Sequence, residues 1–484
     1  MNLHAPNDVP EAVAVQQGGG AIRKLIWTYF FLLMFEGVLR KWVFPGLSNP
    51  LMLIRDPFLL TIYLFAIGQG FFVFNGYVTA LGVLGCLTAF LGITIGTQDP
   101  LVTAYGFDAC FFHLPLIFII PKVMTRDHVL ALGKWVLILT IPMAVLMVMQ
   151  FRAPPNAWIN CGAGGGTGAQ IQAALGKIRP PGFFTFINGA AQFLALSSVF
   201  LIYGLFNKIT YRTWLVMICG TALVIAVGVS SSRLALGAIG LVFSMIGVAI
   251  YYDPRSVRGV VRMLIPIGLI LLVATNLDVF KEGREVFEAR LVDTGDARAG
   301  LGGTASNWAQ RVLGDYYGWY YWVQNVPVLG KGLGMGTNVG ARFLARTADY
   351  QSAEGEMARV IIEMGPIIGS FYLLLRHTIC LTLFGAAARS ARAGNVLPLL
   401  LFGSCVLLVS AGQFSQTCTL GFAVIGAGFC LASTRLTESE PVESGGGPNG
   451  PGDGQIKDWQ VKPRGCGPHA QHLHPALPGP SPGG

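Results

Sequence analysis

Three arginines stand directly beside apolar runs of the sequence. Arg179 and Arg359 each precede such a run, and Arg233 lies in the short polar turn Ser-Ser-Ser-Arg between two of them. A guanidinium group is planar and can bind two oxygens of one phosphate. Together these positions indicate contact with a phosphate or pyrophosphate at a membrane surface. For each arginine taken singly, an ordinary ion pair or contact with a lipid headgroup is the more frequent explanation.

A second group of side chains that could bind a substrate is Arg311, Asp315 and the aromatic sequence DYYGWYYW at 315–322. Aromatic rings can stack on sugar rings, and Asp315 could bind hydroxyl groups, so we include this segment among the candidate substrate contacts. The commoner alternative is a belt of Trp and Tyr at the level of the lipid headgroups. Arg311 and Asp315 are four residues apart, share one face if helical, and could simply pair.

The composition decides what kind of elements must carry these residues. Of 484 residues, 53% are hydrophobic and 12% are charged, whereas a soluble chain usually carries about 25% charged residues. This excludes a soluble enzyme, a disordered protein and a nucleic-acid-binding protein. The formal net charge of +9 is explained by basic loops on one side of a membrane. The nine cysteines form no CxxC or secretory pattern, so we expect no disulfide framework and no zinc site. We also expect no other metal and no cofactor.

At about 20 apolar residues per span, the chain has room for about twelve transmembrane helices. We therefore predict an all-α, polytopic transmembrane helical bundle. Its apolar runs are 25–39, 57–75, 77–95, 108–121, 129–150, 184–206, 213–229, 234–252, 263–279, 358–385, 396–412 and 418–434. His113 and His377 lie in or at spans, and we expect each to be a lone histidine that is hydrogen-bonded within the bundle.

Lys and Arg in the short loops assign the orientation. Twelve spans place both termini on one side, and alternate loops on that side are basic. These loops carry Arg23/Lys24, Lys122/Arg126, Lys208/Arg212, Arg255/Arg258/Arg262, Arg389/Arg392 and Arg435. We assign this side to the cytoplasm, which places Arg179, Arg233 and Arg359 on the outer side.

This orientation divides the chain into five parts. Residues 1–22 are predicted to be a disordered cytoplasmic N-terminus, and 23–279 a region of about nine spans. A large outer loop follows at 280–357, then about three spans at 358–436. The Gly- and Pro-rich residues 437–484 are predicted to be a disordered cytoplasmic tail.

Four segments follow one another in a suggestive order: RPPGFFTFIN at 179–188, SSRLAL at 231–236, PVLGKGLG at 327–334 and EMGPIIG at 363–369. Each resembles a motif of the bacterial O-antigen ligase and O-antigen polymerase family, in the family's order. The resemblance covers roughly residues 180–376, with agreement in hydropathy elsewhere. Each motif alone is weak, and the specificity comes from their order, spacing and placement.

The resemblance implies a GT-C-like glycosyltransferase at the periplasmic face of the bacterial inner membrane. The family's donor is a glycan on undecaprenyl pyrophosphate, and its acceptor is a second lipid-linked repeat or the lipid A core. Carried over to this sequence, Arg179 and Arg233 contact the donor pyrophosphate, with Arg359 and Asn188 as further substrate-binding residues. Arginines that neutralise the leaving group would make a metal unnecessary.

One departure from the family concerns the histidine that ligases and many relatives carry at the end of the outer loop. Here the loop has no histidine, and Glu354 stands about where it would be, with Glu356 close behind. A carboxylate could replace the imidazole as general base toward a sugar hydroxyl. It could equally be the ion-pair partner of Arg359. The departure argues against a ligase more than against a polymerase.

The sequence thus predicts a polymerase of lipid-linked polysaccharide repeats, for an exopolysaccharide or O-antigen. A ligase that transfers glycan to lipid A core or protein is the nearest alternative, and a non-enzymatic transporter or scaffold for a lipid-linked saccharide is the other. Membrane lipids and the lipid-linked glycan are the expected ligands. A chain-length regulator or a flippase would be the protein partner, and no nucleic acid is expected.

Overall fold

The computed structural model describes residues 9–207, 210–293, 313–314, 317–344 and 355–435. The chain divides into two units, Met1–Thr437 and Glu438–Gly484, and all the described residues belong to the first. Within them the structure is helical, with a single isolated β-bridge between Gln172 and Ile178.

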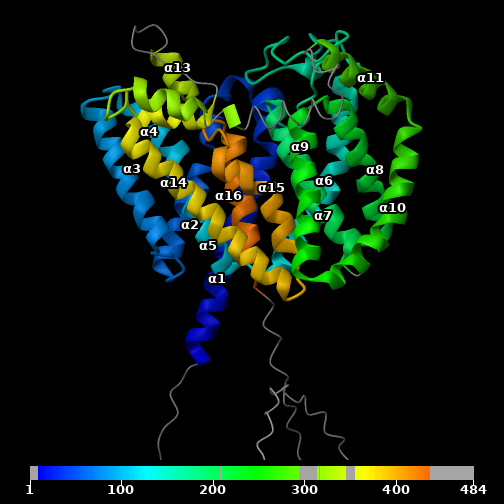
Figure 1. The fold of residues 1–484 in the computed structure, drawn as a ribbon. Helices are drawn as coiled ribbons and strands as arrows, with labels where there is room; N and C mark the ends of the chain where they lie inside the picture. Colours follow the sequence, from blue (N-terminus) through cyan, green and yellow to red (C-terminus); the bar gives the residue numbers. More distant parts are fainter. Residues whose placement is uncertain (1–8, 208–209, 294–312, 315–316, 345–354, 436–484) are drawn as a thin grey trace, which may run out of the picture. The chain divides into compact units, whose positions relative to one another are not determined.

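The helices of the first unit follow one another closely in the sequence (Figure 1). They are α1 (Val9–Val38), α2 (Asp56–Gly68), α3 (Gly76–Thr94), α4 (Pro100–Phe107), α5 (Leu116–Val123), α6 (Arg126–Arg152), α7 (Ile187–Phe206), α8 (Thr213–Ser230), α9 (Arg233–Tyr252), α10 (Val257–Thr275), α11 (Asp278–Asp293), α13 (Asn338–Leu344), α14 (Glu356–Arg392), α15 (Leu397–Ala411) and α16 (Thr417–Ala432). Two π-helical turns, Leu39–Val43 and Asp108–Phe112, extend α1 and α4.

Eight of the helical segments in the described part of the chain are long and apolar enough to cross a membrane. A ninth candidate is the pair Pro100–Phe112 and Leu116–Val123, which is bent by 42° at the break between its halves. Helices α15 and α16 are shorter and also apolar. The length and composition of these helices mark the chain as a multi-pass helical membrane protein.

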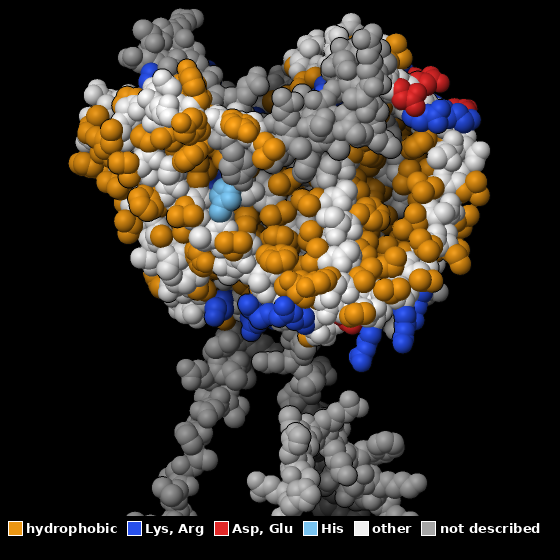
Figure 2. All heavy atoms as spheres, viewed as in Figure 1, with side chains coloured by type: hydrophobic (Ala, Val, Ile, Leu, Met, Phe, Trp, Pro, Cys, Tyr) orange, Lys and Arg blue, Asp and Glu red, His pale blue; other side chains and the backbone are white. Residues whose placement is uncertain are grey.

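Burial separates a central helix from peripheral ones. In α7, 94% of an 18-residue apolar stretch is buried. The helix packs against α6, α8, α9, α10, α15 and α16. In α3 and α10 the buried share is 22%. Large apolar side chains such as Phe90 on α3 and Ile265 on α10 are exposed. Figure 2 shows hydrophobic side chains over much of the viewed face, as expected for a surface that contacts lipid.

Local sequence explains where several helices begin. Asn75 accepts a hydrogen bond from the Val78 amide at the start of α3, and Asp99 accepts from Leu101 at the start of α4. Ser232 does the same for Ala235 in α9. Such side chains satisfy amides that have no partner within the first helical turn. These capping residues therefore define where α3, α4 and α9 begin.

The helices run between two ends of the unit, which Figure 1 shows at the bottom and top of the view. We call the first the short-loop end, because it holds the connections 124–125, 253–256 and 393–396. Backbone and side-chain contacts there join Arg126 with Arg435, Asn395 with Ser433, and Arg392 with the ring of Tyr252.

We call the opposite end the long-loop end, because the connections 39–55 and 153–186 and the described part of 276–355 lie there. The Arg40 carbonyl accepts from Gly164, Lys177 pairs with Glu282 at 2.6 Å, and Arg290 donates to the carbonyl of Ser231. The described residues of the basic loops that we predict to be cytoplasmic fall at the short-loop end. The arginines that depart from this pattern fall at the long-loop end.

Each of the twelve predicted apolar runs overlaps a helix, while the boundaries differ. Helix α1 begins at Val9, within the segment predicted to be disordered, and α11 and α13 lie in the predicted outer loop. The run 108–121 is interrupted at residues 113–115, where Pro115 precedes α5. A proline cannot donate its backbone nitrogen to a continuing helix, which accounts for the break.

Candidate functional site

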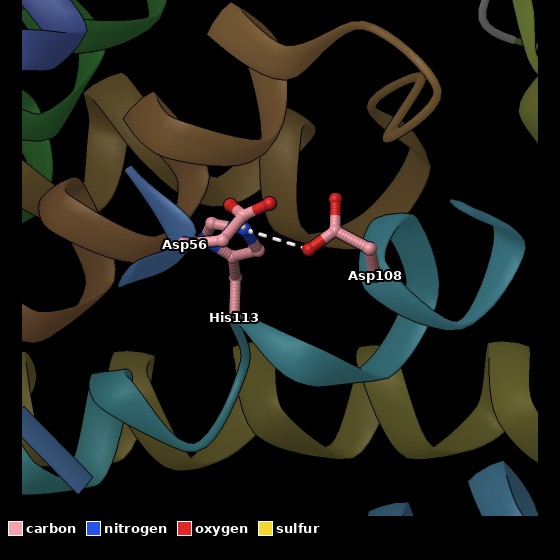
Figure 3. Close-up of side chains that lie close together, drawn as sticks. All are labelled: Asp56, Asp108 and His113. Atoms are coloured by element: carbon pink, nitrogen blue, oxygen red, sulfur yellow. Dashed lines mark hydrogen bonds and ion pairs between the residues drawn. The ribbon is translucent and has the colours of Figure 1, made fainter. Parts of the chain in front are cut away.

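The long-loop end holds a cluster of two carboxylates and one imidazole (Figure 3). Asp56 is the first residue of α2, Asp108 begins the π-helical turn after α4, and His113 stands at the break before α5. The Nε2 atom of His113 lies 3.2 Å from an oxygen of Asp56 and 3.2 Å from an oxygen of Asp108. The helix break is thus what turns the imidazole toward both carboxylates.

The other ring nitrogen of His113 defines how this cluster is hydrogen-bonded. Its Nδ1 atom lies 2.8 Å from the hydroxyl of Tyr29, which in turn accepts from the Arg55 guanidinium at 3.1 Å. The Nε2 atom faces two carboxylates, which accept hydrogen bonds when ionised, so it carries a hydrogen that points at them. A hydrogen-bonded chain runs from Arg55 through Tyr29 and His113 to the Asp56–Asp108 pair.

Burial differs along this hydrogen-bonded chain. His113 is 1% exposed, whereas the side chains of Asp56 and Asp108 are 20% and 19% exposed. Both carboxylates line a narrow cavity of about 20 Å³ together with Arg55 and Thr337. A space of this size accommodates about one water molecule. The carboxylates are therefore the members of the cluster that can reach a small polar ligand.

The cluster also has the residue types of a metal site. One ligand atom from each of Asp56, Asp108 and His113 can be chosen so that all lie within 4.8 Å of one another. A metal would need the lone pair of Nε2, so the hydrogen that points at the carboxylates would have to leave that atom. The buried Arg55 guanidinium opposes a further cation. The geometry thus fits a hydrogen-bonded cluster, and the absence of a metal stays a prediction.

A second network of charges lies at the beginning of α14. Arg359 pairs with Glu356 at 2.8 Å and with Glu363 at 2.9 Å, and Arg376 pairs with Glu356 at 2.7 Å. All four side chains are buried. The spacings of three and four residues place Glu356, Arg359 and Glu363 on one helix face. Burial of these charges is tolerated because each carboxylate meets a guanidinium.

The glycine-rich segment 327–336 packs directly on this network. The amides of Gly334 and Gly336 donate to the carboxylate of Glu363 at 3.2 and 2.9 Å. The Lys331 amide donates to the Ile362 carbonyl at 2.8 Å. Gly365 has a φ of 80°, which kinks α14, and a Cβ atom there would lie 2.2 Å from the carbonyl of Val328. Two segments that carry the family resemblance, 327–334 and 363–369, are therefore in contact.

Arg179 is positioned by the loop before α7. Its amide donates to Ile171 at 2.9 Å beside the Gln172–Ile178 bridge, and its side chain is half-buried. Three residues later, the Gly182 carbonyl accepts from the Lys41 ammonium at 2.6 Å, and its amide donates to Gln150 at 2.8 Å. The loop is therefore anchored at Gly182 through both its carbonyl and its amide.

Lys41 itself is a buried cation, 1% exposed, and its ammonium lies 4.0 Å from the centre of the Trp42 ring. Burial lowers the pKa of Lys41 from 10.5 to about 7, although the nearby Cys161 thiol opposes the shift. Lys41 is therefore readily neutral near physiological pH while it holds the Gly182 carbonyl.

Arg233 is the first residue of α9 and is half-buried. The turn before it depends on Ser231, whose φ of 45° is left-handed, and on Ser232, which caps the helix. Asn188, at the start of α7, donates to the Gln416 side chain at 3.0 Å. These residues lie at the long-loop end, but on other segments than the Asp56–His113–Asp108 cluster.

The structure brings together only some of the predicted site residues. Glu356 and Arg359 are paired, so the guanidinium of Arg359 is engaged by two carboxylates and the carboxylate of Glu356 by two guanidiniums. The alternative of an ion pair thus applies to Glu356. Glu354, Arg311 and Asp315 lie outside the described residues, as does the first part of the aromatic sequence at 315–316.

Sequence reasoning missed the cluster around His113. The expectation that His113 and His377 are hydrogen-bonded within the bundle is confirmed, and His377 contacts the carbonyl of Leu373 in its own helix. The expectation that His113 stands alone is wrong, because Asp108 and Asp56 contact it. Asp108 and His113 are five residues apart in one apolar run, and this pairing was the available signal.

No family model matches the chain, and neither the curated proteins nor the solved structures include a significant match.

Proposed function

We propose that this chain is a GT-C-like glycosyltransferase of the bacterial inner membrane that polymerises undecaprenyl-pyrophosphate-linked polysaccharide repeats at the periplasmic face. The observation that carries the proposal is the Asp56–Asp108 carboxylate pair beside His113. Carboxylates at the end of a transmembrane bundle, partly exposed and hydrogen-bonded to a buried imidazole, are suited to accept a proton from a hydroxyl. Oligosaccharide hydroxyls are the acceptors that the sequence motifs imply.

In the proposed reaction, a hydroxyl of the acceptor sugar attacks the anomeric carbon of the donor sugar. A new glycosidic C–O bond forms as the bond between that carbon and the pyrophosphate oxygen breaks. The hydroxyl proton passes to Asp108 or Asp56, and undecaprenyl pyrophosphate leaves with the electron pair. His113 donates to both carboxylates and is a positioning residue. This assigns the base to a different pair than Glu354 and Glu356.

The donor side of the proposal rests on cations at the same end of the unit. Arg179 and Arg233 remain the proposed contacts of the pyrophosphate, and Asn188 a neighbouring one. Arg359 is assigned to holding Glu363 against the glycine-rich segment, because its guanidinium already contacts two carboxylates. An apolar groove of about 970 Å³ between α6, α8 and α10 reaches Arg152 at this end. A prenyl chain is the kind of ligand that such a groove suits.

The narrow cavity at the two carboxylates requires movement before a sugar can enter. Thr337 closes one side of it and directly follows the glycine-rich segment. That segment is held to α14 by amide hydrogen bonds to the carbonyls of Ile362 and Glu363 and to the Glu363 carboxylate. We propose that its displacement widens the cavity. A closed site excludes water, which otherwise competes with the acceptor hydroxyl.

Twelve spans with both termini in the cytoplasm remain part of the proposal. The eight candidate spans, the bent pair, α1 and the two shorter helices α15 and α16 would supply them. The short-loop end, with its basic loops, is then the cytoplasmic end. The long-loop end with both charged networks is then periplasmic, where lipid-linked repeats would be joined.

The test is an elongation assay with the purified full-length protein in nanodiscs and a labelled undecaprenyl-pyrophosphate repeat as the only substrate. We expect a ladder of longer products. One of the single variants Asp108→Asn and Asp56→Asn, the one that removes the base, should lower its rate about 10²- to 10⁴-fold, the usual contribution of a general base. Glu285→Gln, an exposed carboxylate on α11, is the matched control and should elongate normally.

Other outcomes separate the alternatives. Transfer only when lipid A core or a protein acceptor is added identifies a ligase. Bound glycan lipid without any product favours a transporter or scaffold. A ladder that persists in both Asp108→Asn and Asp56→Asn but is lost in Glu354→Gln would assign the general base to Glu354. Loss of the ladder in Arg179→Gln and Arg233→Gln, with normal folding, supports their pyrophosphate contact.

A further inference from the structure

A cavity of about 590 Å³ opens at the short-loop end, far along the helices from the carboxylate pair. Its lining comes from the first turns of α6, the end of α7, the segment that leads into α8 and the first turns of α10. The volume lies in the range of small-ligand sites, about 300–1,000 Å³. None of its lining residues belongs to the proposed glycosyl-transfer site.

Three cations from two helices converge on this cavity: Arg126 and Lys134 from α6 and Arg262 from α10. Asp127 is the one acid among its lining residues, so the formal charge of the lining is positive. Arg126 is fixed in place, because its guanidinium donates to the Tyr203 hydroxyl and lies 5.8 Å from the centre of that ring. Lys134 and Arg262 are exposed and can swing toward a ligand.

The lining of the cavity is apolar as well as charged. Leu130, Ala131 and Phe206 contribute apolar side chains, and Tyr211 bridges two lining segments by donating to the Leu130 carbonyl at 3.0 Å. Large apolar side chains of the same two helices, Trp135 on α6 and Val261 on α10, are exposed. A ligand that fits has an anionic head and an apolar body. A free inorganic anion would leave the apolar lining uncovered.

We infer that this cavity binds the phosphate headgroup of an anionic phospholipid from the leaflet at the short-loop end. Arginine and lysine from separate helices would bind the phosphate oxygens, and the glycerol and first acyl carbons would cover Leu130 and Phe206. Basic pockets between transmembrane helices suit such headgroups, and each basic residue strengthens the attraction. The inference is independent of the proposed glycosyl transfer.

The experiment reconstitutes the full-length protein in nanodiscs of mixed phosphatidylcholine and phosphatidylglycerol, extracts it into mild detergent and counts retained lipids by native mass spectrometry. We expect one phosphatidylglycerol to be retained in preference to phosphatidylcholine. Arg262→Gln and Lys134→Gln should each reduce this retention about fivefold. Arg255→Gln is the matched control, because Arg255 is exposed at the same end but does not line the cavity, and it should retain the lipid.

Equal retention by the double variant Lys134→Gln/Arg262→Gln would overturn the inference. So would displacement of the lipid by millimolar inorganic phosphate, which would make the cavity a site for the free anion. The thermal unfolding temperature of each variant distinguishes lost binding from lost folding. Lys134 is exposed on a helix surface, so its substitution alone should leave folding intact and keeps the experiment decisive.

Discussion

At the residue scale, the buried charges of this protein differ in how they are compensated. Glu356, Arg359 and Arg376 compensate one another by direct ion pairs, whereas Lys41 has a carbonyl and an aromatic ring as its neighbours. An ion pair keeps both groups charged, whereas a neutral amine can still donate a hydrogen bond to a carbonyl. The two kinds of buried charge should therefore respond differently to pH and to substitution.

Lys41 predicts a specific dependence of stability on pH. The pKa of Lys41 is about 7 in the folded protein and 10.5 in its ordinary environment. Between these values the unfolded chain binds one more proton than the folded one, so stability rises as pH rises from about 7. Lys41→Met should flatten this slope in thermal unfolding measured between pH 7 and 9. Lys281→Met, at an exposed lysine, should leave the slope as it is. An unchanged slope in Lys41→Met would show that Lys41 is not the group responsible.

Glu356→Gln is expected to damage folding before it affects chemistry. The substitution leaves Arg359 and Arg376 buried with one fewer carboxylate, which typically costs about 3–5 kcal/mol. Glu288→Gln breaks an exposed pair with Arg284 and should cost less than about 1 kcal/mol. Denaturation in detergent, followed by tryptophan fluorescence, compares the two. A well-folded Glu356→Gln protein without elongation activity would instead support the catalytic role of Glu356.

At the element scale, the contact between the glycine-rich segment and the kink of α14 depends on two backbones approaching closely. Gly330 and Gly365 both have positive φ, and a Cβ atom on either would lie within 2.5 Å of the opposing backbone. The Glu363 carboxylate accepts hydrogen bonds from two amides of the segment and also pairs with Arg359. The kink, the segment and the charged network are therefore one structural unit.

Gly365→Ala tests this unit, with Gly394→Ala as its control. Both glycines have positive φ, but nothing lies within 4 Å of a Cβ atom at Gly394. Backbone strain alone should cost Gly394→Ala about 1–2 kcal/mol. Gly365→Ala adds the collision with Val328 and should cost about 1–3 kcal/mol more. Unfolding temperatures measured side by side report the difference, and equal losses would contradict the close approach.

At the scale of the whole molecule, the two ends of the unit differ in their loops and in the chemistry that they hold. Basic residues gather at the short-loop end, and Figure 2 shows Lys and Arg side chains along that edge of the viewed face. The cluster around His113 and the network of Glu356, Arg359 and Arg376 both lie toward the long-loop end. The proposed function requires the long-loop end to face the periplasm.

Labelling of introduced cysteines tests this orientation. Asn49 is exposed at the long-loop end, and Arg255 is exposed at the short-loop end. In intact cells whose outer membrane has been permeabilised, a membrane-impermeant maleimide should label Asn49→Cys. Arg255→Cys should be labelled only after the inner membrane is opened. Labelling of the unsubstituted chain is the background, and the reverse pattern would invert the topology.

The sequence was sufficient for the elements and insufficient for the contacts between them. Apolar runs and flanking cations predict helices well because each signal is local, and every predicted run overlaps a helix. The cluster of Asp56 and His113 joins residues 57 positions apart, and Tyr29 joins it from a third helix. Such contacts depend on packing, which no local pattern contains. The pairing of Glu356 with Arg376 likewise depends on the kink at Gly365.

The length of α14 has a consequence for the depth of the charged network. Its 37 residues would span about 55 Å if straight, whereas the hydrocarbon core of a bilayer is about 30 Å thick. The kink at Gly365 separates the first nine residues of α14 from the rest of the helix, so these nine residues need not continue along the membrane normal. Hydrophobic mismatch would then be taken up at Gly365, and the thickness of the surrounding bilayer would determine how far Glu356 and Arg359 lie from water.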